Sequence, residues 1–221
     1  YRSDGSERVY SAEKIVASSI AELEFSKSYP EHFIFAGPLL YTPPQPSSGG
    51  PEFTPGRRHI LITLGSHQAH HKDSLADTMR FIARNHPEWV FHFTDGDIAS
   101  NRSSHDENFH RHSFIHYDAL LPRYDLVIHH GGMGVLLHCL SHGIPAIVLP
   151  MDFDQFDYAA RLADKGLAYR VKSPEQIGAA LPLAMNDSSM IQRCREYAAI
   201  IATYQPGPML TKMISETFPE R

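Results

Sequence analysis

The order of elements predicted over residues 125–161 constrains the fold more than any other feature of the chain. DLVIH (125–129) is an apolar, β-branched run of strand length, and HGGMG (130–134) lets the chain turn without Cβ atoms into a helix. A second apolar run, AIVL (146–149), ends at Pro150, and the acidic loop MDFDQ leads into another helix. Strand, turn and helix repeated in this order predict parallel strands whose carboxyl ends share one edge, where ligands collect.

The remaining pattern also alternates between strands and helices. Further strands are predicted at 60–64, 89–93, 113–115 and 167–171, and further helices at 74–84, from 155 to Gly166, and from the Ser-Pro-Glu-Gln start at 173–176 onward. The fold class predicted is therefore α/β, a Rossmann-like parallel sheet flanked by helices.

Proline, glycine and serine are dense in residues 42–58, TPPQPSSGGPEFTPGRR, which predicts an exposed linker. Residues 11–40 before it predict one helix and a strand at 33–35, too little to bury a core alone. We expect three parts: residues 1–58 as the end of something larger plus the linker, 59–205 as the main domain, and 206–221 as a C-terminal helix.

Composition excludes several classes of protein. The formal charge is -5 with a sequence pI near 6.3, and no basic cluster with interleaved aromatics occurs, so no nucleic-acid partner is expected. No apolar run approaches the roughly 20 residues of a membrane span, and no signal-peptide core begins the chain. Cys139 and Cys194 fall in predicted helices and are expected to be buried, reduced thiols. We therefore expect a cytoplasmic protein.

The glycine turn predicts an anion site. Free backbone N–H groups at residues 132–135 would face a diphosphate, and His130 beside them can donate a further hydrogen bond to a phosphate oxygen. The alternatives are a tight turn with no ligand, or a nicotinamide dehydrogenase. The dehydrogenase is disfavoured because one glycine of the dinucleotide fingerprint is missing and several strands precede the turn.

Two other positions could reach the same ligand. Asp154 and Gln155 adjoin after the second strand and suit sugar hydroxyls, although an acid at a helix N-terminus is also favoured by the helix dipole. Ser66 follows the strand at 60–64 and either reaches phosphate or caps the next helix. The histidines at 67–71 and 105–116 are interpreted as scattered loop residues, so no metal site is expected although the chain has 15 histidines. No G-x-S-x-G nucleophile elbow is present.

Taken together, ALLPRYDLVIHHGGMG followed by GIPAIVLPMDFDQFDYAAR resembles the donor signature of GT-B glycosyltransferases, specifically the UDP-glycosyltransferase and macrolide-glycosyltransferase superfamily. ILITLGS resembles the first strand of that family's C-terminal domain, and AELE with FIFAGPLL resembles the end of its N-terminal acceptor domain. The resemblance covers nearly the whole chain.

The resemblance implies a role for each matched residue. His130, Gly132, Gly134 and Ser66 match diphosphate-binding positions, and Val135 replaces the usual Ser or Thr while keeping its backbone N–H. Further positions match nucleobase and ribose contacts, with Tyr117 in place of a polar residue: Phe114, Ile115 and Tyr117. Asp154 and Gln155 match the pair that holds the sugar, and Tyr158 stands where an Asn is frequent.

The function implied is the donor-binding part of an inverting, hexosyltransferase-type enzyme. It would move a sugar from a UDP-sugar or TDP-sugar to a hydroxyl of a small lipophilic acceptor, with no metal and no other cofactor. The family's general base lies near the start of the N-terminal domain, so the chain alone is expected to lack it and to be inactive. A nucleotide-sugar epimerase of similar architecture and a non-catalytic nucleotide-binding module remain as alternatives.

Overall fold

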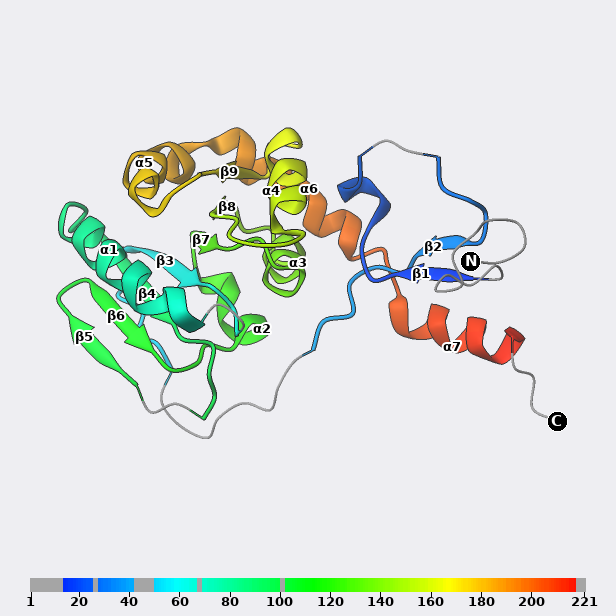
Figure 1. Ribbon diagram of the computed structural model, residues 1–221, viewed down its shortest axis with the longest axis horizontal. Coiled ribbons are helices and arrows are strands. Elements are labelled where there is room, and N and C mark those ends of the chain that lie inside the picture. Colours follow the sequence, from blue (N-terminus) through cyan, green and yellow to red (C-terminus); the bar gives the residue numbers. More distant parts are fainter. Residues whose placement is uncertain (1–13, 26–27, 42–49, 67–68, 100–101, 218–221) are drawn as a thin grey trace. The chain divides into compact units, whose positions relative to one another are not determined.

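The computed structural model describes residues 14–25, 28–41, 50–66, 69–99 and 102–217 (Figure 1). Contacts between residues divide the chain into two compact units. The larger unit comprises residues 40–199, and the smaller unit combines residues 1–39 with residues 200–221. The sequence predicted divisions at residues 58 and 205 instead. Tyr204 explains the second difference, because its hydroxyl contacts Glu22 and the backbone of Ala21, which ties the C-terminal segment to the N-terminal one.

A seven-stranded sheet forms the centre of the larger unit (Figure 1). Its strand order is β5-β6-β4-β3-β7-β8-β9, and every pair is parallel except β5 with β6. The strands are β3 (Arg58–Thr63), β4 (Trp89–Thr94), β5 (Ser104–Asp106), β6 (Phe109–His112), β7 (Leu126–His129), β8 (Ala146–Val148) and β9 (Ala168–Arg170). The predicted α/β class with a mostly parallel sheet is confirmed.

Helices alternate with these strands, as predicted. They are α1 (Lys72–Arg84), α2 (Tyr117–Leu120), α3 (Met133–Ser141), α4 (Gln155–Asp164), α5 (Ile177–Asn186) and α6 (Ser188–Ile201). Short 3-10 turns cover Ala69–His71, Leu121–Arg123 and Pro174–Gln176. Helices α1 and α5 lie close together, since a Cβ on Gly178 of α5 would be 3.7 Å from Ile82 of α1.

The central strands form because their sequences are apolar on both faces. Every residue of β4, β7 and β8 is buried, and only Arg58 of β3 is exposed. The sequence of a parallel strand that helices cover on both faces is almost continuously apolar, whereas a strand with one exposed face alternates apolar and polar residues. Cys139 and Cys194 are both buried and free, as expected.

The strand predicted at 113–115 is wrong. Those residues follow β6, which pairs with β4, and the β5–β6 hairpin was missed. The reason is that β6 reads Phe-His-Arg-His and only Phe109 is fully buried. Asn108 secures the hairpin instead, because its side-chain amide is buried and lies 2.8 to 3.0 Å from three backbone oxygens at the end of α1 and the start of β4.

The smaller unit contains a two-stranded parallel sheet, β1 (Ile15–Ala17) with β2 (Phe33–Phe35), a 3-10 turn at Ala21–Leu23, and helix α7 (Pro206–Thr217). The helix predicted within residues 11–40 is therefore wrong for the described part of that stretch. The strand at 33–35 and the C-terminal helix are found where predicted. Tyr204 packs against Gly37, whose φ of 87° and lack of a Cβ allow the approach.

The predicted linker is only partly described. Residues 42–49 lie outside the described residues, and Phe53 in the second half packs on the sheet instead of being an exposed linker residue. Its ring lies 4.8 Å from the ring of His59 and 5.1 Å from that of Tyr124, and Arg123 stacks over it at 3.9 Å. An aromatic residue with these partners anchors the chain as it enters β3.

Beneath Phe53, histidines bond to one another across adjacent strands. His59 Nδ1 lies 2.9 Å from His92 Nε2, and His92 Nδ1 lies 3.1 Å from His112 Nε2. Burial, with a smaller contribution from the neighbouring histidines, lowers the pKa of His92 to about 2 and that of His112 to about 4. These rings are therefore neutral at pH 7, and each nitrogen pair shares one proton.

This row of histidines predicts that the fold loses stability in mild acid. The unfolded chain takes up protons below a pKa of about 6.5, whereas folded His92 and His112 do not until far lower pH, so stability falls as the pH drops below about 6.5. Between pH 7 and pH 5, His92 alone should lower the free energy of unfolding by roughly 2 kcal/mol. Urea unfolding of the wild type and of His92→Gln, which cannot titrate at this position, measures the contribution of His92 to the change in the free energy of unfolding between the two pH values. Equal stability of the wild type at pH 7 and pH 5 would contradict the assignment.

Candidate functional site

Three adjacent strands end in the same local structure. The last residues of β4, β3 and β7 are paired in register, and the side chain of each accepts a hydrogen bond from the amide of the glycine two residues later. The pairs are Thr94 with Gly96 at 3.1 Å, Thr63 with Gly65 at 3.0 Å, and His129 with Gly131 at 3.0 Å. All three glycines have positive φ, between 63° and 93°, which explains why glycine is needed. The chain therefore turns away from the sheet three times along one edge.

His129 can accept this bond because it is neutral. Complete burial lowers its pKa to about 3, with a smaller contribution from His130. Its Nδ1 therefore carries a lone pair toward Gly131 at neutral pH.

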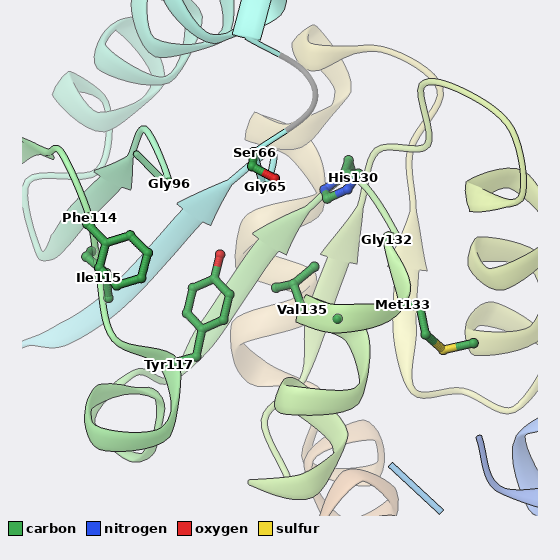
Figure 2. A pocket seen from close by; sticks show the side chains of 11 residues that line it. Gly65, Ser66, Gly96, Phe114, Ile115, Tyr117, His130, Gly132, Met133 and Val135 are labelled. Atoms are coloured by element: carbon green, nitrogen blue, oxygen red, sulfur yellow. The ribbon is translucent and has the colours of Figure 1, made fainter. Parts of the chain in front are cut away.

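A pocket of about 470 Å³ opens above these turns (Figure 2). The residues that line it are Gly65, Ser66, Gly96, Phe114, Ile115, Tyr117, His130, Gly132, Met133, Gly134 and Val135. They come from the ends of β3, β4 and β7, the segment before α2 with the first residue of that helix, and the first turn of α3. This is the carboxyl edge of the parallel strands, the position where ligands bind in open α/β sheets.

His130 lies between two glycines. A Cβ on Gly65 would come within 2.9 Å of its ring, and a Cβ on Gly132 would collide with Nε2. The imidazole is 9% exposed and forms part of the pocket wall (Figure 2). Glycine at both positions is therefore what allows the ring to lie at the pocket.

The first turn of α3 supplies backbone donors. The N-cap residue is Gly132, and no side chain caps the helix. The first intrahelical bond runs from the amide of Leu136 to the carbonyl of Gly132, at 3.1 Å, so the amides of Met133, Gly134 and Val135 precede it. Such amides carry the positive end of the helix dipole and bind anions.

Aromatic side chains form the opposite wall. Figure 2 shows Phe114 and Tyr117 on one side of the pocket and His130 on the other. The Tyr117 hydroxyl bonds to Thr63 Oγ1 at 2.9 Å, which links this wall to the end of β3. Burial raises the pKa of Tyr117 to about 12, so the hydroxyl stays protonated at neutral pH.

The loop that carries Gly96 is held by buried charges. Asp95 is 6% exposed and accepts hydrogen bonds from the Arg111 guanidinium at 2.7 to 3.2 Å. Lys72 of α1 donates to the Asp95 carbonyl, and Asp73 accepts a further bond from Arg111 at 2.7 Å. Breaking a buried pair would leave an uncompensated charge, which is costly. This network therefore holds in place the loop after β4 that carries Gly96 to the pocket.

The structure brings most of the predicted site together. Eight predicted residues line the one pocket: Ser66, Phe114, Ile115, Tyr117, His130, Gly132, Gly134 and Val135. None of these described lining residues is acidic, and none is Lys or Arg. An anion would therefore meet backbone N–H groups, a helix dipole and the His130 imidazole rather than a Lys or Arg side chain.

Asp154 and Gln155 do not line this pocket. Gln155 is 7% exposed, and its Oε1 accepts the amides of Met151 and Asp152 at 2.9 and 3.0 Å. Its carbonyl oxygen therefore orders the loop after β8. Asp154 is exposed at the N-cap of α4. Sugar binding by this pair stays a prediction.

Of the three other lining residues, Gly65 adjoins the predicted Ser66, and sequence reasoning missed Gly96 and Met133. Gly96 had a recognisable signal, since Thr-x-Gly follows β4 as it follows β3. Met133 lies inside the glycine turn that was identified.

The interpretation of the histidines at 105–116 as loop residues is wrong for His105, His110 and His112, which lie on β5 and β6. One further pair, in a predicted helix, was not considered as metal ligands. His138 and His142 are separated by three residues at the end of α3, and Asp118 of α2 lies opposite them. Each offers a possible metal-ligand atom within 4.8 Å of the others. The pattern His-x3-His lay in the predicted helix, but its carboxylate partner comes from another element.

Among the helices of the described residues, none combines the length and apolar character that crossing a membrane requires.

Known proteins resemble this chain in sequence. Residues 60–211 match the family described as erythromycin biosynthesis protein CIII-like, C-terminal domain. UDP-glucosyltransferase A1 of Starmerella bombicola is 28% identical over 168 residues, which is 73% of this chain and 36% of that protein. Zeaxanthin glucosyltransferase of Pseudescherichia vulneris is 30% identical over 159 residues, 71% of this chain and 38% of that protein. The chain thus spans less than two fifths of these relatives.

Solved structures show the same fold. The glycotransferase of kitacinnamycin superposes with a TM-score of 0.77 at 22% identity, over 94% of this chain and 55% of that one. The glycosyltransferase SnogD from Streptomyces nogalater gives a TM-score of 0.69 at 22% identity, over 91% of this chain and 55% of that one. With the family match over most of the chain, the sequence belongs to the erythromycin biosynthesis protein CIII-like family, as its C-terminal domain, and its fold is that of the corresponding part of GT-B glycosyltransferases.

Proposed function

We propose that the pocket at the start of α3 binds the diphosphate of a nucleoside-diphosphate sugar. The observation that carries this proposal is the meeting of uncapped amides at residues 133–135 with the His130 imidazole at one pocket wall. Hydrogen bonds from neutral donors to charged oxygens are each worth about 1.5–3 kcal/mol. Several such donors suffice to hold a diphosphate without an arginine.

The aromatic wall suits the nucleoside. Phe114 offers a ring face for a base, and the backbone of Ile115 lies beside it at the same pocket. The Tyr117 hydroxyl is within reach of the pocket but is already hydrogen-bonded to Thr63. Its main role in this proposal is therefore to position the aromatic wall, and any contact with the ligand is secondary. UDP and TDP both fit this description, and a relative named UDP-glucosyltransferase favours UDP.

The reaction proposed for the whole enzyme is inverting transfer of a hexosyl group. A base outside this chain takes a proton from an acceptor hydroxyl, the hydroxyl oxygen forms a bond to the anomeric carbon, and the bond to the diphosphate oxygen breaks. Charge then grows on the diphosphate, where the α3 amides and His130 stabilise it. The acceptor is a small lipophilic alcohol bound by the rest of the enzyme, in line with the relative named zeaxanthin glucosyltransferase. No metal is assigned a step.

A non-catalytic nucleotide-binding module is the second candidate. It is favoured by the position of the residues predicted to hold the sugar. Gln155 Oε1 already accepts hydrogen bonds from two backbone amides, and Asp154 lies outside the pocket lining. A module of this kind would bind UDP and UDP-glucose equally well. A donor site should bind the sugar nucleotide differently from UDP, because the sugar adds contacts.

Calorimetry with UDP and TDP tests the donor-site proposal. The chain should bind at least one of them with a dissociation constant between about 1 µM and 1 mM, the range usual for enzyme substrates. Turnover of UDP-glucose by the isolated chain should be absent or slight. No heat of binding from either nucleotide at millimolar concentration would count against the pocket as a donor site.

Filling the pocket from α3 should block the nucleotide without harming the fold. A Cβ on Gly134 meets nothing within 4 Å, and Gly134 lines the pocket, so the side chain of Gly134→Leu enters it. Leu exceeds Gly in helix propensity by about 0.8–1 kcal/mol, so thermal stability should hold or rise, while UDP affinity should fall at least about tenfold.

Gly207→Leu is the matched control. It also places a leucine on a helical glycine with open space around it, in α7. It should leave UDP affinity unchanged. If Gly134→Leu binds UDP as tightly as this control does, the nucleotide does not lie against the first turn of α3.

A further inference from the structure

Three side chains outside the lining of the donor pocket lie close together, and the proposed function gives them no role. Asp118 belongs to α2, His138 to the last turn of α3, and His142 follows at the C-cap of that helix. The ligand atoms of all three lie within 4.8 Å of one another. Residues four apart on a helix lie on one face, so both imidazoles are directed to the same side.

The chemistry of this group is specific. Two imidazoles and one carboxylate are ligands for Zn²⁺ and related divalent transition metals, whereas Mg²⁺ and Ca²⁺ take oxygen ligands. Tetrahedral bonds of about 2.05 Å place ligand atoms about 3.4 Å apart. The observed limit of 4.8 Å thus requires a closing movement of about 1.4 Å or less, which rotation of the partly exposed His142 can supply.

His138 and Asp118 already face each other. His138 is 7% exposed, and its Nδ1 lies 2.9 Å from Asp118 Oδ1, a contact between an imidazole and a carboxylate. Two of the three candidate ligand atoms therefore already lie at about the separation that ligands of one ion require.

An ion can reach the group from outside. His142 is partly exposed and lines a cavity of about 410 Å³ at the edge of the sheet where β3 and β7 begin. Arg58, Arg195 and Asp125 line the same cavity, so an approaching cation meets charges of both signs there.

We propose that Asp118, His138 and His142 bind a divalent transition metal ion of the zinc type that joins α2 to α3. Water completes the coordination. The ion has a structural effect on the donor pocket, because Tyr117 precedes Asp118 and its ring meets the His138 ring edge-on at 5.5 Å. Metal binding thereby holds the aromatic wall, and it does not depend on whether the pocket takes a nucleotide.

Zinc titration of the full chain tests the proposal. After treatment with EDTA, the wild type should bind one equivalent of ZnCl2 at this site, and its melting temperature should rise by about 5 °C at saturating zinc. MgCl2 should give no rise. His142→Ala and Asp118→Asn should each lose most of the rise. Both residues are partly exposed, so both variants are expected to fold, and a melting curve in EDTA checks this.

His105→Ala is the matched control, because the Nδ1 atoms of His105 and His110 lie 3.0 Å apart and form the competing pair. It should respond to zinc as the wild type does. The proposal is overturned if zinc does not stabilise the wild type, or if His142→Ala keeps the full rise. It is also overturned if the rise is lost in His105→Ala and retained in Asp118→Asn.

Discussion

The proposed donor pocket depends on one repeated interaction, in which the last side chain of a strand accepts a hydrogen bond from the amide of the glycine two residues later. Thr94, Thr63 and His129 make it at the ends of three adjacent strands, in register. The result is a close approach of loops, since a Cβ on Gly96 would lie 3.0 Å from the carbonyl oxygen of Gly65. The same turns leave room for the His130 ring. Sheet register thus determines where the pocket's polar groups lie.

The pocket would meet an anion without a Lys or Arg side chain. No Lys, Arg, Asp or Glu is among its described lining residues, so affinity must come from oriented N–H donors and the α3 dipole. A helix N-terminus contributes about 0.3–2 kcal/mol to a bound charge, and each amide bond to a charged oxygen about 1.5–3 kcal/mol. Several donors acting together outweigh any single one. Such a site stabilises charge that grows on a leaving diphosphate without holding the product as an arginine pair would.

The sequence predicted the fold class because β3, β4, β7 and β8 are buried on both faces and read as continuous apolar runs. It missed the β5–β6 hairpin, which is secured by Asn108 and backbone pairing rather than by apolar residues. Most candidate site residues meet at one pocket because glycine turns at strand ends have a local signal. The use of Gln155 Oε1 within its own loop, and the carboxylate opposite His138, depend on tertiary contacts that no local pattern carries.

The family match and the fold relate this chain to the C-terminal part of GT-B glycosyltransferases, and its relatives are longer by a factor of about two or more. The central claim is that backbone amides at the start of α3 hold the diphosphate. Its most direct test is amide NMR of the ¹⁵N-labelled chain titrated with UDP. The account predicts that the amides of Met133, Gly134 and Val135 shift most and saturate together. UDP binding that shifts amides elsewhere and leaves these three unchanged would contradict it.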